Sequence, residues 1–94
     1  MATKSEIAAK KHLEGELEET LRWAGHDDAS WDSDIKDGYP NNNICGRAAK
    51  IAKIVETYSL DRVLLTETLT KLYDKLIDLK RFGIAAALAK TYDL

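Results

Sequence analysis

Two stretches of the chain nearly repeat each other, and this echo constrains the fold more than any other feature of the sequence. Residues 46–60 read Gly-Arg-Ala-Ala-Lys-Ile-Ala-Lys-Ile-Val-Glu-Thr-Tyr-Ser-Leu, and residues 83–94 read Gly-Ile-Ala-Ala-Ala-Leu-Ala-Lys-Thr-Tyr-Asp-Leu. The closing tetrapeptides, 57–60 and 91–94, lie 34 positions apart, whereas the opening glycines lie 37 apart, so the second copy is about one helical turn shorter. A period of this size is typical of stacked helical hairpins. The sequence therefore predicts an all-α domain with a degenerate α-hairpin internal repeat.

Length and composition predict a single domain. The chain has 94 residues, enough for a modest core and too few for two domains. Its single cysteine, Cys45, cannot form an internal disulfide, and residues 1–6 lack the apolar run of a secretory signal. Charged residues interrupt every apolar segment before it reaches the roughly 18 to 20 residues that cross a bilayer. We therefore expect a cytoplasmic protein with no membrane partner.

The two halves of the chain differ in charge. Residues 1–43 contain five Lys and Arg against ten Asp and Glu, whereas residues 44–94 contain nine against six. Opposite charges attract within one molecule, between subunits or toward a charged partner, and charge counts leave these alternatives open. Together with a leucine seam long enough for two neighbours, the asymmetry predicts a homodimer.

The first helix is predicted over residues 4–24. Thr3 followed by Glu6 fits a capping box, and Gly25 suits a left-handed C-terminal cap. Residues 26–43 lack any sustained period, contain the single proline and are rich in aspartate, so we expect an acidic loop. Loops of this length in compact domains often take part in binding or are disordered, and the sequence leaves both alternatives open.

Three further helices are predicted over residues 44–58, 60–81 and 84–92. Gly83 is expected to separate the last two, which then form an antiparallel hairpin. Because of the echo, we expect residues 44–58 to form the second helix of an earlier, degenerate hairpin, as residues 84–92 do in the later one. The first helix would be the other arm of that earlier hairpin. The predicted architecture is a four-helix antiparallel, bundle-like single domain.

Two helix faces stand out in this pattern. Leucines at alternating steps of four and three form a seam that we expect in the core or at an oligomer interface: Leu65, Leu69, Leu72, Leu76 and Leu79. On the second helix, a basic stripe is expected opposite the apolar face: Arg47, Lys50 and Lys53.

Residues 44–94 resemble tetratricopeptide-like α-hairpin repeats. The resemblance rests on the period and on the placement of Phe82, Ala85 and Ala89. The early Trp, the Leu-Gly pair and the closing Pro of that motif are missing. The resemblance therefore implies a hairpin architecture and no particular function.

Aromatic residues in or beside the acidic loop are the first candidates for recognition. Large aromatic side chains are common anchors in protein interfaces, which makes Trp23, Trp31 and Tyr39 candidate protein contacts. Burial over the open end of the core is the alternative.

The basic stripe is the second candidate. Cations spaced along a helix can neutralise successive phosphates of a nucleic acid. Contact with the acidic first helix or with a partner subunit is the alternative. The pI of about 5.6 lies below that of typical nucleic-acid-binding domains and favours a protein partner.

Metal and catalytic motifs are incomplete. Asp32, Asp34 and Asp37 before Gly38 approximate a calcium loop, but the fifth, sixth and twelfth positions of that loop do not match. His26 with Asp27, Asp28 and Cys45 offers too few ligands for a structural zinc and no positioned base for a thiol nucleophile. We expect no cofactor, no metal and no catalytic residue. The predicted function is that of a small non-enzymatic protein-interaction or regulatory module, with nucleic-acid binding by the second helix as the alternative.

Overall fold

The residues that the structure describes fold into four α-helices, as predicted. The computed structural model describes residues 3–26, 31 and 43–94, and Tyr39 with most of the predicted acidic loop lies outside these ranges. The helices are α1 (Lys4–Ala24), α2 (Ile44–Thr57), α3 (Arg62–Asp78) and α4 (Phe82–Tyr92). The described residues form no β-ladder, so the all-α class is confirmed.

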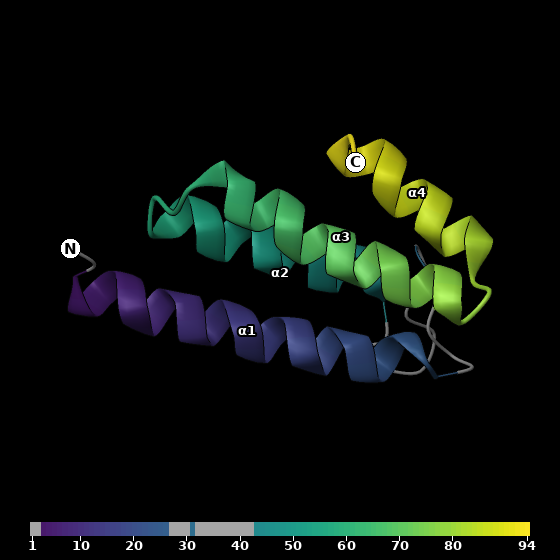
Figure 1. The fold of residues 1–94 in the computed structure, drawn as a ribbon, viewed down its shortest axis with the longest axis horizontal. Helices are drawn as coiled ribbons and strands as arrows, with labels where there is room; N and C mark the ends of the chain where they lie inside the picture. Colours follow the sequence, from purple (N-terminus) through teal and green to yellow (C-terminus); the bar gives the residue numbers. More distant parts are fainter. Residues whose placement is uncertain (1–2, 27–30, 32–42) are drawn as a thin grey trace.

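Successive helices run in opposite directions (Figure 1). The helices α1, α2 and α3 pack against one another, whereas α4 packs on α3 and on part of α2. Within the described ranges α4 makes no contact with α1, so the fourth helix extends a three-helix group instead of closing a square bundle. The two closest antiparallel pairs are α1 with α2 and α3 with α4, in agreement with the predicted hairpins.

The core runs along the inner faces of all four helices. Leu69, Leu72 and Leu76 are fully buried, where the alternating leucine spacing predicts the core side of α3. Burying a leucine side chain stabilises a fold by about 1.5 to 3 kcal/mol relative to leaving it exposed. The outer two seam residues are less covered: Leu65 and Leu79 are partly buried and pack against the core. The remaining fully buried apolar residues are Ala24, Ile44, Ala48, Ile51, Ala85 and Leu88.

The echoed tetrapeptides end helices. Ser59 and Asp93 occupy matching positions and have left-handed backbones, with φ of 50° and 55°. The amide of the following leucine then donates to a carbonyl five residues back, from Leu60 to Val55 and from Leu94 to Ala89, each at 2.9 Å. This geometry satisfies carbonyls that would otherwise lack a helical partner. Each echoed copy is therefore a helix together with its C-terminal stop.

The turn between α3 and α4 differs from the prediction. The helix predicted over 60–81 spans only Arg62–Asp78, because Asp61 caps its start and Lys80, with φ of 61°, ends it. The Arg81 amide bonds to the Leu76 carbonyl at 2.8 Å, which completes the same type of stop. The prediction that Gly83 separates the two helices is wrong, because α4 already begins at Phe82.

Other helix ends agree better with the sequence. The bounds predicted for the first helix match α1, and the Thr3 hydroxyl accepts the Glu6 amide at 3.1 Å. Asn43 caps α2 in the same way by accepting the Gly46 amide. Gly25 does end α1, but with φ of −83°, so the predicted left-handed cap is wrong. Within the described ranges, no helix is both long and apolar enough to cross a membrane.

Candidate functional site

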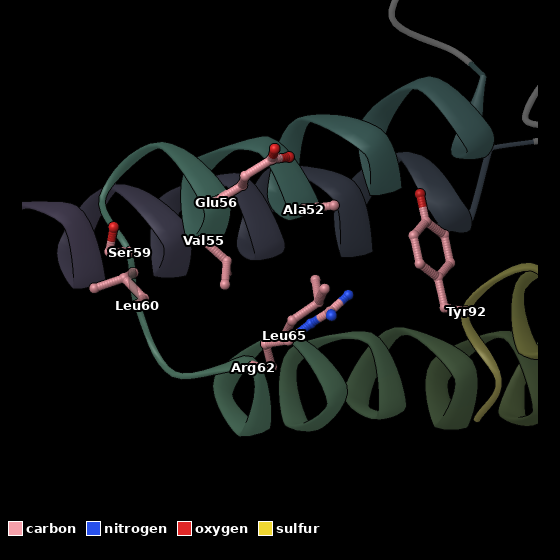
Figure 2. Close-up of a pocket in the computed structure, with 8 residues that line it drawn as sticks. All are labelled: Ala52, Val55, Glu56, Ser59, Leu60, Arg62, Leu65 and Tyr92. Carbon is pink, nitrogen blue, oxygen red and sulfur yellow. The ribbon is translucent and has the colours of Figure 1, made fainter.

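An open groove lies between α2 and α3, next to the end of α4. Its volume is about 590 Å³, and we call it the α2–α3 groove. Figure 2 shows side chains of α2, α3, α4 and the α2–α3 turn around it. Its apolar lining comes from Ala52, Val55, Leu60 and Leu65, and its polar lining from Glu56, Ser59, Arg62 and Tyr92.

The groove exists because α4 is short. The helix α4 has 11 residues and α3 has 17, which correspond to lengths of about 16 Å and 26 Å. Since α4 starts at the C-terminal end of α3 and runs back along it, it stops before reaching the first turns of α3 (Figure 1). The side chains of Leu65 on α3 and Val55 on α2 therefore border open space beyond Tyr92. The groove continues the surface on which α4 itself packs.

A cation lies in this groove. The Arg62 side chain extends into the space between α2 and α3, close to Leu65, whereas the Glu56 carboxylate points away from α3 (Figure 2). Arg62 is exposed, and no hydrogen bond or ion pair joins it to another described residue. Its position in the first turn of α3 is unfavourable, because a helix N-terminus carries a partial positive charge. The groove thus combines apolar walls with an available guanidinium group.

Tyr92 closes the end of the groove nearest to α4. Its ring is partly buried and packs against the core, and its hydroxyl points toward α2 (Figure 2). Burial raises the pKa of the Tyr92 phenol above its ordinary value, and Cys45 contributes in the same direction. The phenol is therefore neutral at physiological pH and can donate one hydrogen bond.

Arg47 does not belong to an exposed basic stripe. Its side chain is only 4% exposed, and its guanidinium carbon lies 5.4 Å from the centroid of the Trp23 ring. Burial lowers the pKa of the Arg47 guanidinium, while the carboxylates of Glu19 and Glu16 act in the opposite direction. The predicted exposure of Arg47 is wrong because α2 packs against α1 on one side and against α3 on another. The buried surface of α2 therefore extends beyond its apolar residues and includes Arg47.

Trp23 contributes the aromatic ring on which Arg47 packs. Its indole Nε1 donates to Glu19 Oε1 at 3.3 Å, and its ring centroid lies 4.7 Å from that of His26. The Arg81 guanidinium donates to the backbone carbonyl of His26, which joins the end of α1 to the α3–α4 turn. Trp23 thus packs against its own chain, and its role as a partner contact stays untested.

Trp31 and Tyr39 are the other predicted aromatic contacts. Trp31 is partly buried against the core, and its carbonyl accepts the amide of Cys45 at 3.0 Å. This bond holds Trp31 beside the start of α2. Tyr39 lies outside the described residues.

Lys50 and Lys53 are exposed on α2 and border a different groove. One hollow of about 390 Å³ and another of about 300 Å³ share His12 and Tyr58 as lining residues. We call the two together the α1–α2 groove. Among the described residues, those that line it are Ser5, Ala8, Ala9, His12, Glu16, Lys50, Lys53, Ile54, Thr57 and Tyr58.

The sequence predicts no metal site, and the incomplete motifs considered for one are only partly covered by the described residues. Among residues 3–26, 31 and 43–94, no three His, Cys, Asp or Glu side chains are close enough to hold a metal ion. The aspartates of the incomplete calcium loop, together with Asp27 and Asp28, fall outside these ranges.

Sequence reasoning did not single out Arg62 and Tyr92 as parts of one site. Their proximity arises from the packing of α4 against α3 and α2. The one sequence signal was that the second copy of the echo is shorter than the first. This difference indicates that α4 is shorter than α2. Comparison with known proteins adds no assignment: no family model, curated protein or solved structure matches the chain.

Proposed function

We propose that this protein is a non-enzymatic interaction module that binds an amphipathic helix of a partner protein in the α2–α3 groove. The observation that carries the proposal is the continuity of this groove with the packing surface of α4. A helix lying in line with α4 would cover the same two neighbours that α4 covers, α3 and part of α2. Helices bound in grooves are a common mode of peptide recognition.

The chemistry of the groove defines the partner. Apolar residues at spacings of three and four would cover Val55 and Leu65, while an Asp or Glu beside them would pair with Arg62. A serine hydroxyl from Ser59 and the neutral phenol of Tyr92 offer further hydrogen bonds. We therefore expect an apolar helix with a carboxylate along one edge.

The proposal is tested by selecting binders from a displayed library of amphipathic helices of about 14 residues. Ala52→Trp should weaken the selected helices at least about tenfold, because the indole fills the space that the ligand needs. Ala49→Trp is the matched control, since Ala49 lies on the same helix, is exposed and does not line the groove. Circular dichroism melts of both variants verify that the fold is retained.

Arg62 supplies the second arm of this test. Arg62→Gln should weaken binding about two- to fivefold, as expected for an exposed ion pair, without lowering stability. Lys75→Gln, another exposed cation on α3, should leave binding unchanged. Helices that bind with equal affinity to the Ala52→Trp variant, or a library that yields no binder, would contradict the proposal.

The burial of Arg47 and of the central leucines affects two other functional predictions. Nucleic-acid binding through α2 loses Arg47 from its three cations, and we do not propose it as the main function. The homodimer stays a prediction, now without the central leucines as its interface, because Leu69, Leu72 and Leu76 are buried inside one chain. Its contact would instead draw on exposed apolar side chains such as Phe82, which is 59% exposed.

A further inference from the structure

The helix α1 has an outer face that no other described helix covers. It lies at one edge of the fold, and among the described helices it packs against α2 and α3 (Figure 1). Four residues follow one line along this face at steps of three, four and three, which is the spacing of a coiled-coil seam. We call them the α1 seam: Ile7, Lys10, Glu14 and Leu17. Ile7 is 48% exposed, Lys10 and Glu14 are exposed, and Leu17 is partly buried.

A small hollow lies beside the seam, between α1 and α3. Its volume of about 110 Å³ is below the roughly 300 Å³ at which ligand pockets begin. The described charged residues that line it are two lysines and two glutamates: Lys10, Glu14, Glu67 and Lys71. A ligand of one charge sign, such as a nucleic acid or an acidic peptide, would meet as much repulsion as attraction here. The surface therefore fits a partner that carries both signs.

The charges of the seam are available to such a partner. No hydrogen bond or ion pair joins the side chain of Lys10 or Glu14 to another described residue. The lysine precedes the glutamate by four positions, which is the less favourable order for a pair on one helix. The same order extends along α1, since residues 4–12 contain three Lys and one Glu, whereas residues 13–24 contain four Glu and one Arg. The helix macrodipole favours the opposite order, so a contact outside the helix accounts for it better.

From this charge order we propose that the α1 seam pairs with the α1 seam of a second copy of this chain, with the two helices antiparallel across a two-fold axis. Lys10 of each copy then lies opposite Glu14 of the other, and Ile7 lies opposite Leu17, because both pairs have position 12 as their midpoint. A parallel pair would instead set each lysine against the same lysine. Charge complementarity thus selects the second copy and fixes its direction.

The length of α1 suits this contact, and the contact is independent of the α2–α3 groove. The helix has 21 residues, which is about three heptads. No residue of the seam lines the α2–α3 groove. Ala52→Trp, which fills that groove, should therefore leave self-association unchanged, and the two proposals can fail separately.

Charge reversals test the pairing, with the dimer dissociation constant measured by sedimentation equilibrium at low ionic strength. Glu14→Lys should raise this constant at least about tenfold, because the two-fold axis turns two attractions into two repulsions. Lys10→Glu should act in the same way. The double variant Lys10→Glu/Glu14→Lys restores opposite charges at both contacts and should return the constant to within about threefold of the original. Lys75→Glu, at an exposed lysine of α3, is the control and should change it less than about twofold.

Apolar variants test the other half of the seam. Ile7→Ser should weaken the dimer at least about fivefold, because the contact with Leu17 of the second copy is lost. Phe82→Ser removes another exposed apolar side chain and should have little effect. Circular dichroism melts verify that each variant is folded. A chain that is monomeric at every concentration, a double variant as weak as the single ones, or a dimer lost with Phe82→Ser and kept with Ile7→Ser would each overturn the proposal.

Discussion

Replacing Arg47 by glutamine should destabilise the protein, although Arg47 belongs to a stripe that sequence alone predicts to be exposed. The guanidinium is buried over the Trp23 ring and close to the carboxylates of Glu16 and Glu19. Glutamine removes the charge and shortens the side chain. It therefore removes the cation–π contact and the charge attraction to Glu16 and Glu19, of which Glu19 keeps its ion pair with Arg22 at 3.3 Å.

The magnitude follows from these losses. A partly desolvated cation–π contact contributes about 0.5 to 2 kcal/mol, and each buried methylene contributes about 0.8 kcal/mol. Removal of a desolvated charge offsets part of this loss. We expect Arg47→Gln to lower the free energy of unfolding by about 1 to 2.5 kcal/mol. Lys53→Gln, the same chemical change at an exposed position of α2, should change it by less than about 0.5 kcal/mol.

Urea denaturation followed by circular dichroism measures both variants. A double-mutant cycle of Arg47→Gln with Trp23→Leu should return a coupling energy of about 0.5 to 2 kcal/mol, because both changes remove the same contact. If Arg47→Gln and Lys53→Gln are equally stable, the buried contact has no energetic role and the reasoning fails. A coupling energy near zero would refute the assignment to Trp23 in particular.

Leu72→Ala should lower the free energy of unfolding by about 2 to 5 kcal/mol, whereas Val63→Ala at a 58% exposed position should change it little; a melting temperature unaffected by Leu72→Ala would contradict its place in the core. Lys80→Gly should raise stability by up to about 1 kcal/mol in urea denaturation, because glycine adopts the left-handed backbone without steric cost. Stability should fall above about pH 10: Tyr92 has a raised pKa in the folded state, so the unfolded chain loses that proton first and alkali favours unfolding. Tyr92→Phe should reduce this alkaline loss more than Tyr58→Phe does, in urea midpoints measured from pH 8 to 11. Light scattering should give about twice the 10.5 kDa chain mass for the predicted homodimer, and a monomer mass at micromolar concentrations would reject it.

The helices could be predicted from local signals. The bounds of α1 follow from Thr3 as its cap and from the end of its apolar period, and the buried face of α3 follows from the leucine spacing. Helix ends with left-handed Ser59 and Lys80 were harder to predict, because glycine is the usual residue there. For Ser59 the echo contained this information, since both copies close with a left-handed residue, Ser59 or Asp93, followed by leucine. That these positions stop a helix can be recognised only when their backbone angles are known.

The candidate sites could be predicted only in part. Lys50 and Lys53 are exposed as expected, but the burial of Arg47 depends on how far α1 wraps around α2. Periodicity along one helix gives the direction of its apolar face and says little about the width of the arc that its neighbours cover. The surroundings of Trp23 could not be predicted for the same reason. Its ring contacts Glu19 on its own helix and Arg47 on α2.

The sequence by itself determined the all-α class, the order and approximate length of the helices, and the central leucines of the core. These properties follow from caps, apolar period and helix stops, which act within a few residues along the chain. Tertiary structure alone decided that Arg62 and Tyr92 border one groove and that Arg47 packs on Trp23. Such relations join residues from different helices, and packing between helices fixes them, because a local pattern carries no information about how neighbouring elements are offset and turned.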